Sequence, residues 1–185
     1  MPELNEFSYK KRIMKLYNEQ EYVETYNRRY NSIQLEKYET ILPYLENQTI
    51  RILDIGVGTG LFLDKVVSQW TLIGTDMSLR MLHMAKKRAK SRSNVELVLA
   101  DADYLPFQEH MFQVVTTFTL LQNMPNPLKT VKELIRVSDN LVAITVLKKK
   151  INALSLKELL QKSGVKKFEI IEKRSEDIFA VCYVT

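Results

Sequence analysis

Short apolar runs alternate with longer stretches of helical periodicity from residue 50 onward. Each run has only five to eight mostly apolar residues, which is too short for a helix and predicts a strand covered on both faces. The predicted strands span residues 50–55, 71–75, 95–100, 114–118 and 140–147. Between them, apolar residues recur at intervals of three and four, as in amphipathic helices. This alternation indicates an α/β fold with a doubly wound, mostly parallel sheet.

Residues typical of helix ends support the predicted helices. Asn126 followed by Pro127 is an N-cap with a first-turn proline. Ser155 and Glu158 have the spacing of a capping box, and the short helix that they open can end at Gly164. The apolar stripes that predict the other helices lie in residues 61–70, 79–89 and 128–135.

The two ends of the chain differ from this pattern. Residues 168–173 and 178–184 are predicted strands joined by a polar turn, which indicates a C-terminal antiparallel hairpin and brings the sheet to seven strands. Residues 1–46 are rich in charges and predict helices. They also carry five tyrosines, Tyr9, Tyr17, Tyr22, Tyr26 and Tyr30. We therefore expect an N-terminal helical region, 1–46, and a domain, 47–185, that form one compact unit.

The first strand ends in a loop with glycine at every second position. Asp54 is followed by Gly56, Gly58 and Gly60, and glycine permits both positive φ and close approach of the backbone to a ligand. Dinucleotide-binding enzymes space their glycines differently, as G-x-G-x-x-G. The pattern resembles motif I of class I S-adenosylmethionine-dependent methyltransferases, in which the acidic residue holds the amino end of the cofactor and the glycines admit it. The alternative is a glycine turn selected only for tight packing.

A second acidic residue, Asp76, ends the second predicted strand, 16 positions after Gly60. A carboxylate in this place can accept hydrogen bonds from both ribose hydroxyls of an adenosine cofactor. Asp76 could instead act with Ser78 to cap the next helix.

The resemblance continues at the end of the third predicted strand. In the methyltransferase family, the residues at Asp101 and Ala102 face the adenine amino group and ring. Residues 102–107 are similar to the family's D-A-x-x-L-P-F segment, although Gln113 replaces an aspartate that the family usually has. The match covers about residues 50–147 and implies a Rossmann-like methyltransferase fold.

The resemblance also extends the set of residues expected to bind the cofactor. It implies that Met77 and Thr119 belong to this set and that the N-terminal helices form a lid. Tyr26 matches the tyrosine of the family's A-x-x-Y-D motif. An aromatic ring beside the cofactor's sulfonium would contribute about 0.5 to 2 kcal/mol, whereas the alternative is that this tyrosine only packs.

The acceptor is expected beyond the fourth strand, where open α/β sheets bind ligands. Residues 118–125 lack the N-P-P-Y or D-P-P-Y motif of enzymes that methylate amide or base nitrogens. They look more like the UbiE-like (type 11) group, which includes quinone-biosynthesis and many small-molecule methyltransferases. Gln122 and Asn123 are candidates for substrate contact, although either could only cap the next helix. Because the reaction needs no protein nucleophile, no catalytic residue can be assigned from the sequence.

Composition limits the other classes of function. The chain has 185 residues, one cysteine and two histidines, which suit one domain without a disulfide or a usual zinc site, so we expect no metal. Cys182 lies in an apolar strand and is expected to be buried. We also expect a cytoplasmic protein, since there is no signal-peptide pattern and no apolar run near the ~20 residues of a membrane span.

The net charge of +5 is unevenly distributed. Basic residues cluster in 80–92 and 148–150, where they could neutralise phosphates or simply be solvated. The leading hypothesis is a methyltransferase that uses S-adenosylmethionine and acts on a small molecule or an unidentified acceptor. The alternatives are an RNA-modifying methyltransferase, with a small activator subunit as a possible partner, and a cofactor-binding regulatory module without turnover. An NAD oxidoreductase is disfavoured by the glycine spacing.

Overall fold

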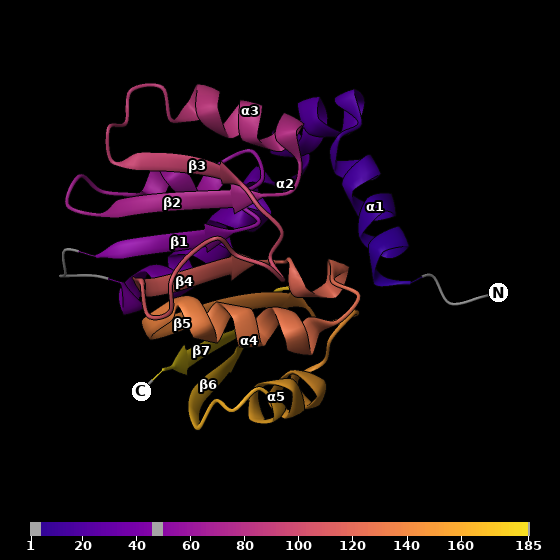
Figure 1. Ribbon diagram of the computed structural model, residues 1–185, viewed down its shortest axis with the longest axis vertical. Coiled ribbons are helices and arrows are strands. Elements are labelled where there is room, and N and C mark those ends of the chain that lie inside the picture. The colour runs from indigo at the N-terminus through magenta and orange to yellow at the C-terminus, as the bar shows by residue number, and fades with distance from the viewer. Residues whose placement is uncertain (1–4, 46–49, 185) are drawn as a thin grey trace.

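The computed structural model describes residues 5–45 and 50–184. A seven-stranded sheet forms its centre, with strand order β3-β2-β1-β4-β5-β7-β6 (Figure 1). Only β7 runs antiparallel to its neighbours, β5 and β6, so the predicted mostly parallel sheet with a C-terminal hairpin is confirmed. The strands are β1 (Arg51–Ile55), β2 (Thr71–Asp76), β3 (Val95–Leu99), β4 (Phe112–Phe118), β5 (Ser138–Leu147), β6 (Lys167–Glu172) and β7 (Asp177–Tyr183).

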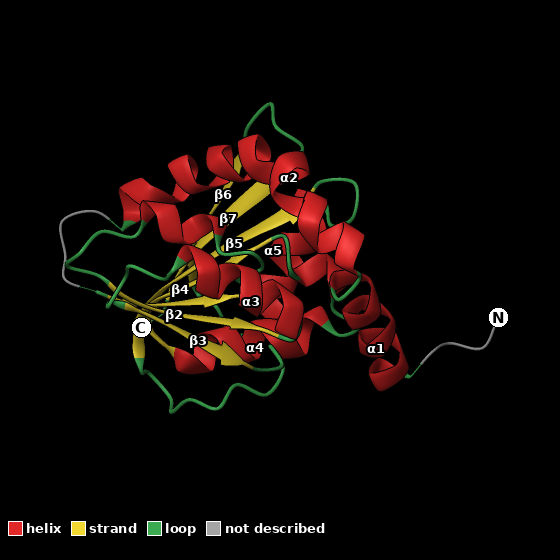
Figure 2. Ribbon diagram, turned by 90° about the horizontal axis from the view of Figure 1, so that it is seen from above, coloured by secondary structure: helices red, strands yellow, loops and turns green. Residues whose placement is uncertain are grey.

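Helices cover both sides of this sheet (Figure 2). Alternate residues of a buried strand point to opposite faces. Ile52 accordingly joins a core cluster with α2 and α3, while Leu53 joins one with α4 and α5. Among the described residues, no helix has the length and apolar character needed to cross a bilayer. The α-helices are α1 (Glu6–Tyr17), α2 (Gln20–Ile41), α3 (Leu79–Arg88), α4 (Pro127–Val137) and α5 (Ala153–Lys162).

Helix α1 lies beside the carboxyl ends of the parallel strands, toward which the arrows in Figure 1 point. None of its residues is buried, whereas α2 buries Tyr38 and Ile41 in the core. The helical prediction for the N-terminal region is confirmed in its described part. The predicted boundary between residues 46 and 47 lies outside the described residues. Cys182 is buried, as expected.

The predicted helix in residues 61–70 is wrong. The chain forms only a short 3-10 helix, η2 (Leu61–Lys65), and becomes extended at Val66. Its apolar side chains are buried nonetheless: Phe62 packs against the ring of Tyr38 on α2, with 5.1 Å between ring centroids. The apolar periodicity thus correctly predicted that this segment is buried. The helix that packs at this position, however, is α2 from the N-terminal region.

The cap of α5 also differs from the prediction. Its N-cap is Asn152, whose side chain accepts a hydrogen bond from the Ser155 backbone N–H at 2.9 Å. Asparagine is as favourable an N-cap as serine, so the helix starts about one turn earlier than the capping-box pattern indicated. The C-terminal prediction is confirmed, because Gly164 follows the helix with a φ of 95°.

Candidate functional site

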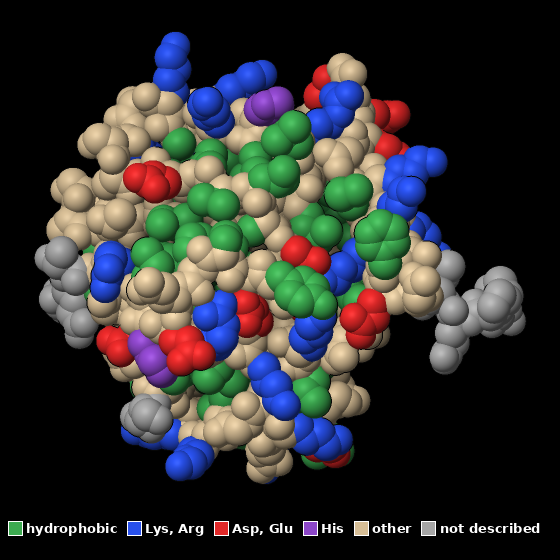
Figure 3. All heavy atoms as spheres, in the orientation of Figure 1, with side chains coloured by type: hydrophobic (Ala, Val, Ile, Leu, Met, Phe, Trp, Pro, Cys, Tyr) green, Lys and Arg blue, Asp and Glu red, His purple; other side chains and the backbone are tan. Residues whose placement is uncertain are grey.

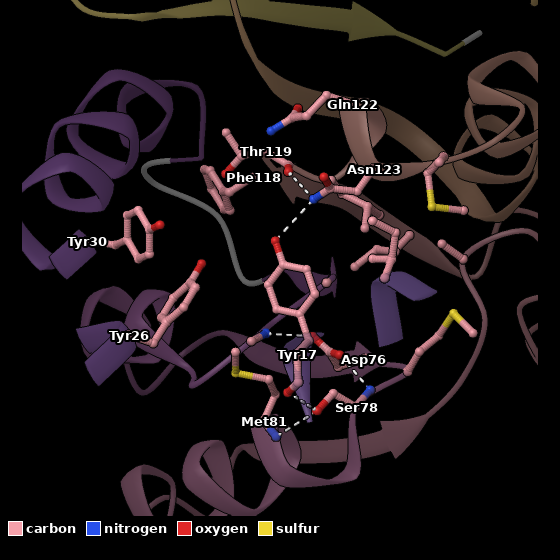
Figure 4. Close-up of a pocket in the computed structure, with 18 of the residues that line it drawn as sticks. Tyr17, Tyr26, Tyr30, Asp76, Ser78, Met81, Phe118, Thr119, Gln122 and Asn123 are labelled. Atoms are coloured by element: carbon pink, nitrogen blue, oxygen red, sulfur yellow. Dashed lines mark hydrogen bonds between the residues drawn. The ribbon is translucent and has the colours of Figure 1, made fainter. Parts of the chain in front are cut away.

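A cavity of about 330 Å³ opens where the carboxyl ends of the strands meet α1 and α2. Its walls come from both helices, the loop after β1, the ends of β2, β4 and β5, and the turn between β6 and β7. The side chains drawn in Figure 4 converge on this space from segments far apart in the sequence. The cavity thus lies at the edge of the sheet where the cofactor is expected from the sequence.

The glycine loop forms one wall, but its glycines differ in role. All three have positive φ, of 77° at Gly56, 56° at Gly58 and 79° at Gly60. Gly56 and Gly58 line the cavity, and a Cβ on Gly58 would meet only the Gly56 carbonyl oxygen, at 3.9 Å. A Cβ on Gly60 would instead lie 3.1 Å from the Ala85 Cα on α3. Gly60, which does not line the cavity, permits close packing of the loop on α3.

Asp76 ties the loop to the start of α3. Its carboxylate accepts hydrogen bonds from the backbone N–H groups of Gly58, at 2.9 Å, and Ser78, at 2.8 Å. Burial raises the pKa of Asp76, and these backbone donors oppose that shift. Ser78 is the N-cap of α3 through its own hydroxyl, which accepts from the Met81 N–H. Asp76 and its neighbour Met77 line the cavity, so Ser78 performs the capping that was the alternative for Asp76.

Asp54 lies deeper than the glycines. It is 2% exposed and faces a small adjoining recess that it shares with Gly56 and Gly58. The Thr116 hydroxyl donates to its carboxylate at 2.9 Å. Burial raises the pKa of Asp54 to about 7, against the effect of Thr116. A cation that reached this recess would favour the ionised carboxylate.

At the end of β3, Ala102 lines the cavity whereas Asp101 does not. The Asp101 carboxylate is bound instead by Lys10 of α1, with Nζ to oxygen distances of 2.6 and 2.8 Å. The same ammonium lies 2.5 Å from the Asp103 carboxylate. Lys10 itself lines the cavity. No pattern in the sequence predicts this contact, because it joins residues 91 positions apart.

Tyrosines form a continuous aromatic wall. The rings of Tyr17, Tyr22, Tyr26 and Tyr30 follow one another with centroid separations of 5.3, 5.9 and 4.8 Å. All four line the cavity. The three on α2 are spaced by four residues and therefore share one helix face. Tyr26 thus belongs to the cavity wall, and the Tyr17 hydroxyl accepts a hydrogen bond from the Asn123 side chain at 3.2 Å (Figure 4).

Beyond β4, Thr119, Gln122 and Asn123 all line the cavity. Thr119 has a φ of 57°, which is rare for a β-branched residue. Sequence reasoning missed the residue opposite it, Lys37 of α2, whose ammonium donates to the Thr119 hydroxyl at 3.3 Å and lies 3.2 Å from the Asp177 carboxylate. The sequence of α2 contains charges of both signs, and nothing in their spacing indicates that Lys37 points into the protein.

Comparison with known proteins agrees with this geometry. A family model described as a methyltransferase domain matches residues 52–140. Malonyl-[acyl-carrier protein] O-methyltransferase of Marinomonas sp. (strain MWYL1) is 32% identical over 139 residues, or 74% of this chain and 51% of that protein. Demethylmenaquinone methyltransferase of Staphylococcus saprophyticus is 40% identical over 91 residues, or 47% of this chain and 39% of that protein. The chain thus spans about half or less of the length of these curated relatives.

The solved structures show the same fold. Magnesium protoporphyrin IX methyltransferase from Synechocystis PCC 6803, crystallised with bound S-adenosylmethionine, superposes with a TM-score of 0.79 at 12% identity. The superposition covers 100% of both chains. The likeness therefore includes the N-terminal helices, which the family model does not reach.

Proposed function

The chain belongs to the class I S-adenosylmethionine-dependent methyltransferases, and from that premise we propose that it methylates a small-molecule acceptor by direct in-line displacement. The cofactor supplies a methyl group on a positively charged sulfur, so the leaving group is a neutral thioether. The protein then needs no nucleophile. Its task is to align the acceptor with the methyl group, and such alignment can contribute roughly 7 to 11 kcal/mol.

The observation that carries this proposal is the convergence of Gly56, Gly58 and Asp76 on one cavity. The space beside Gly58 is open where a Cβ would stand, so the backbone can approach a ligand closely. Asp76 presents a half-buried carboxylate that is suited to ribose hydroxyls. The residues thus fit the cofactor that this family uses.

The remaining predicted contacts keep their proposed roles around this centre. Asp54 faces the ammonium of the cofactor's methionine part, Tyr26 faces the sulfonium, and Ala102 contacts the adenine ring. Met77 and Thr119 line the remainder of the cofactor site. Asp101 reaches the adenine amino group only in competition with Lys10, which holds its carboxylate. Gly60 supports the loop through its packing on α3.

Calorimetric titration with S-adenosylmethionine, S-adenosylhomocysteine and NAD tests the proposal. We expect micromolar dissociation constants for the two adenosyl ligands and no binding of NAD. The tyrosine wall and the carboxylate of Asp54 favour the charged sulfonium and ammonium, which NAD lacks. Absence of binding by both adenosyl ligands would contradict the proposal.

A second candidate is an RNA-modifying methyltransferase that works with a small activator subunit. Exposed lysines on α3 and directly after it support this candidate, namely Lys86, Lys87 and Lys90. Basic side chains gather over α3 at the top of Figure 3, and none of these three lysines lines the cavity. Retention of labelled RNA at about 50 mM salt, lost steeply at about 200 mM, would favour this candidate. The third alternative, a regulatory module, predicts tight cofactor binding with no methyl transfer to any acceptor.

A further inference from the structure

Helix α2 presents two different surfaces to the cavity. Its first half contributes the tyrosines, which end at Tyr30, and its second half contributes Gln34 and Lys37. Lys37 contacts Thr119, which follows the carboxyl end of β4, and Asp177, which is the first residue of β7. The glycine loop and Asp76 belong to β1 and β2, on the other side of β4 in the sheet. One helix therefore covers both the cofactor end of the cavity and the opposite end, which is left for the acceptor.

Lys37 is an unusual residue at this opposite end. It is only 3% exposed, and a buried ammonium is stable only where its donors find partners. Within the described residues, two of its three donors have them: the Asp177 carboxylate at 3.2 Å and the Thr119 hydroxyl at 3.3 Å. Because Lys37 also lines the cavity, the third donor is available to a bound molecule.

The surroundings of Lys37 contain further unsatisfied polar groups. The amide oxygens of Gln34 and Gln122 are buried and have no hydrogen-bond partner, although both residues line the cavity. Burying such an atom without a partner is costly, because it loses its hydrogen bonds to water and gains none in return. The N–H of Thr119 donates a hydrogen bond to the Thr145 hydroxyl, and this bond helps to hold Thr119 in its left-handed conformation. Strained and unpaired groups of this kind cluster at ligand sites.

The charges at this end favour an anion. Lys149 and Lys150 line the cavity beside Lys37, and the acidic lining residue among them is Glu176. Asp177 is already paired with Lys37. Burial lowers the pKa of Lys37, while Asp177 and the neighbouring Glu36 and Glu176 raise it. Three lysines thus line the acceptor end of the cavity against one lining carboxylate, Glu176, while Asp177 is paired with Lys37 and Glu36 is exposed outside the lining.

We propose that Lys37 is the acceptor-binding residue and that the acceptor is a carboxylate; this inference rests on the proposed methyl transfer. One carboxylate oxygen accepts a hydrogen bond from the third N–H of the Lys37 ammonium, which keeps its proton, and the other oxygen attacks the methyl group. The O–CH₃ bond forms as the S–CH₃ bond breaks, and the bonding pair returns to sulfur. Anion and sulfonium become a neutral ester and a neutral thioether, so no proton has to leave. The tyrosine wall contacts the apolar body of the acceptor.

Matched acid and amide probes test this inference. Calorimetry on protein saturated with S-adenosylhomocysteine would compare benzoate with benzamide, and 1-naphthoate with 1-naphthamide. We expect at least one acid to bind tenfold or more tightly than its amide. The variant Lys37→Gln should lose this preference, and Lys37→Arg should keep part of it. Lys157→Gln, which alters an exposed lysine on α5, is the matched control and should behave as the wild type.

Two further measurements separate the possible failures. Removing Lys37 leaves Asp177 buried without its cation, so the double variant Lys37→Gln/Asp177→Asn removes both charges and keeps the test valid if the single variant does not fold. No preference for either acid in the wild type would overturn the inference. So would a tenfold loss of S-adenosylhomocysteine affinity in folded Lys37→Gln, because Lys37 would then serve the cofactor. Failure of the wild type to bind S-adenosylhomocysteine at all would overturn the proposed function itself.

Discussion

The two ends of the cavity are built in different ways. The cofactor end uses a glycine loop and Asp76, which lie within 54–76 and act largely through backbone geometry. The acceptor end joins Lys37, Thr119 and Asp177, which are distant in the chain and act through side chains. A site made from one short βα segment can be recognised in a sequence, whereas a site made from three separate elements exists only after folding.

The two ends also differ in charge. At the cofactor end Asp54 is buried and Asp76 is half-buried; in the proposed arrangement Asp54 pairs with the positive ammonium of S-adenosylmethionine and Asp76 with its ribose hydroxyls. Lys37 is buried at the acceptor end, where it suits a negative group. Opposite charges at the two ends orient two ligands of opposite sign toward each other. We therefore expect that mutations can alter either end without altering the other.

The largest effect is expected from the glycine loop. Gly58→Val places a branched side chain in the open space beside the loop and should weaken S-adenosylhomocysteine binding more than a hundredfold. Gly60→Ala is the control, because its new Cβ would meet Leu63 and the α3 backbone but not the cavity. We expect it to lower the free energy of unfolding by about 1 to 3 kcal/mol and to leave affinity nearly unchanged. Calorimetry and urea unfolding of both variants would measure this, and equal losses of affinity would contradict the assigned roles.

A pH dependence of binding is the next largest effect. The pKa of Asp54 is raised to about 7 by burial, so the carboxyl must release a proton before it can pair with the cofactor's ammonium. Affinity should therefore fall by up to about tenfold per pH unit below 7 and level off above it. Titrations from about pH 5.5 to 8.5 would measure the slope. Asp54→Asn should bind more weakly at pH 8 and show no slope, and a slope that persists would assign it to another group.

The same carboxyl predicts the pH dependence of stability without ligand. A pKa raised above its unfolded value means that the native state binds an extra proton between about pH 4 and 7. The contribution of Asp54 to the free energy of unfolding is thus favourable at low pH and is lost as the pH rises through 7. Urea unfolding should show Asp54→Asn gaining on the wild type across this window. A constant difference would mean that the pKa is not raised in the native state.

Much of the fold could be predicted from the sequence because buried parallel strands are encoded locally, as short apolar runs. The error at 61–70 has a tertiary cause: Phe62 is buried against α2, and no local pattern shows that a distant helix occupies that place. The predicted start of α5 is wrong because the sequence offers two good N-cap residues, Asn152 and Ser155, and the helix begins after Asn152.

The candidate site divides in the same way. Gly58, Asp76 and Ala102 were expected at the cavity and line it, because each lies at the carboxyl end of a strand or in the loop that follows it. Lys10 and Lys37 were missed, although both line the cavity, since their partners lie far away in the chain. Ion pairs between residues that are distant in the chain have no characteristic spacing, so they cannot be recognised in a sequence.

The smallest effect is expected from Lys10, a tertiary contact at the otherwise local cofactor end. Its ammonium contacts Asp101 and Asp103, and α1 has no buried residue to hold it. Lys10→Met should therefore loosen α1, raising its amide hydrogen exchange about tenfold and weakening S-adenosylhomocysteine binding only three- to fivefold. Lys11→Met alters the exposed neighbour and should change neither quantity. Unchanged exchange in Lys10→Met would show that other contacts are enough to hold α1, such as the Ser78 hydroxyl, which donates to the carbonyl of Tyr17 at 2.7 Å.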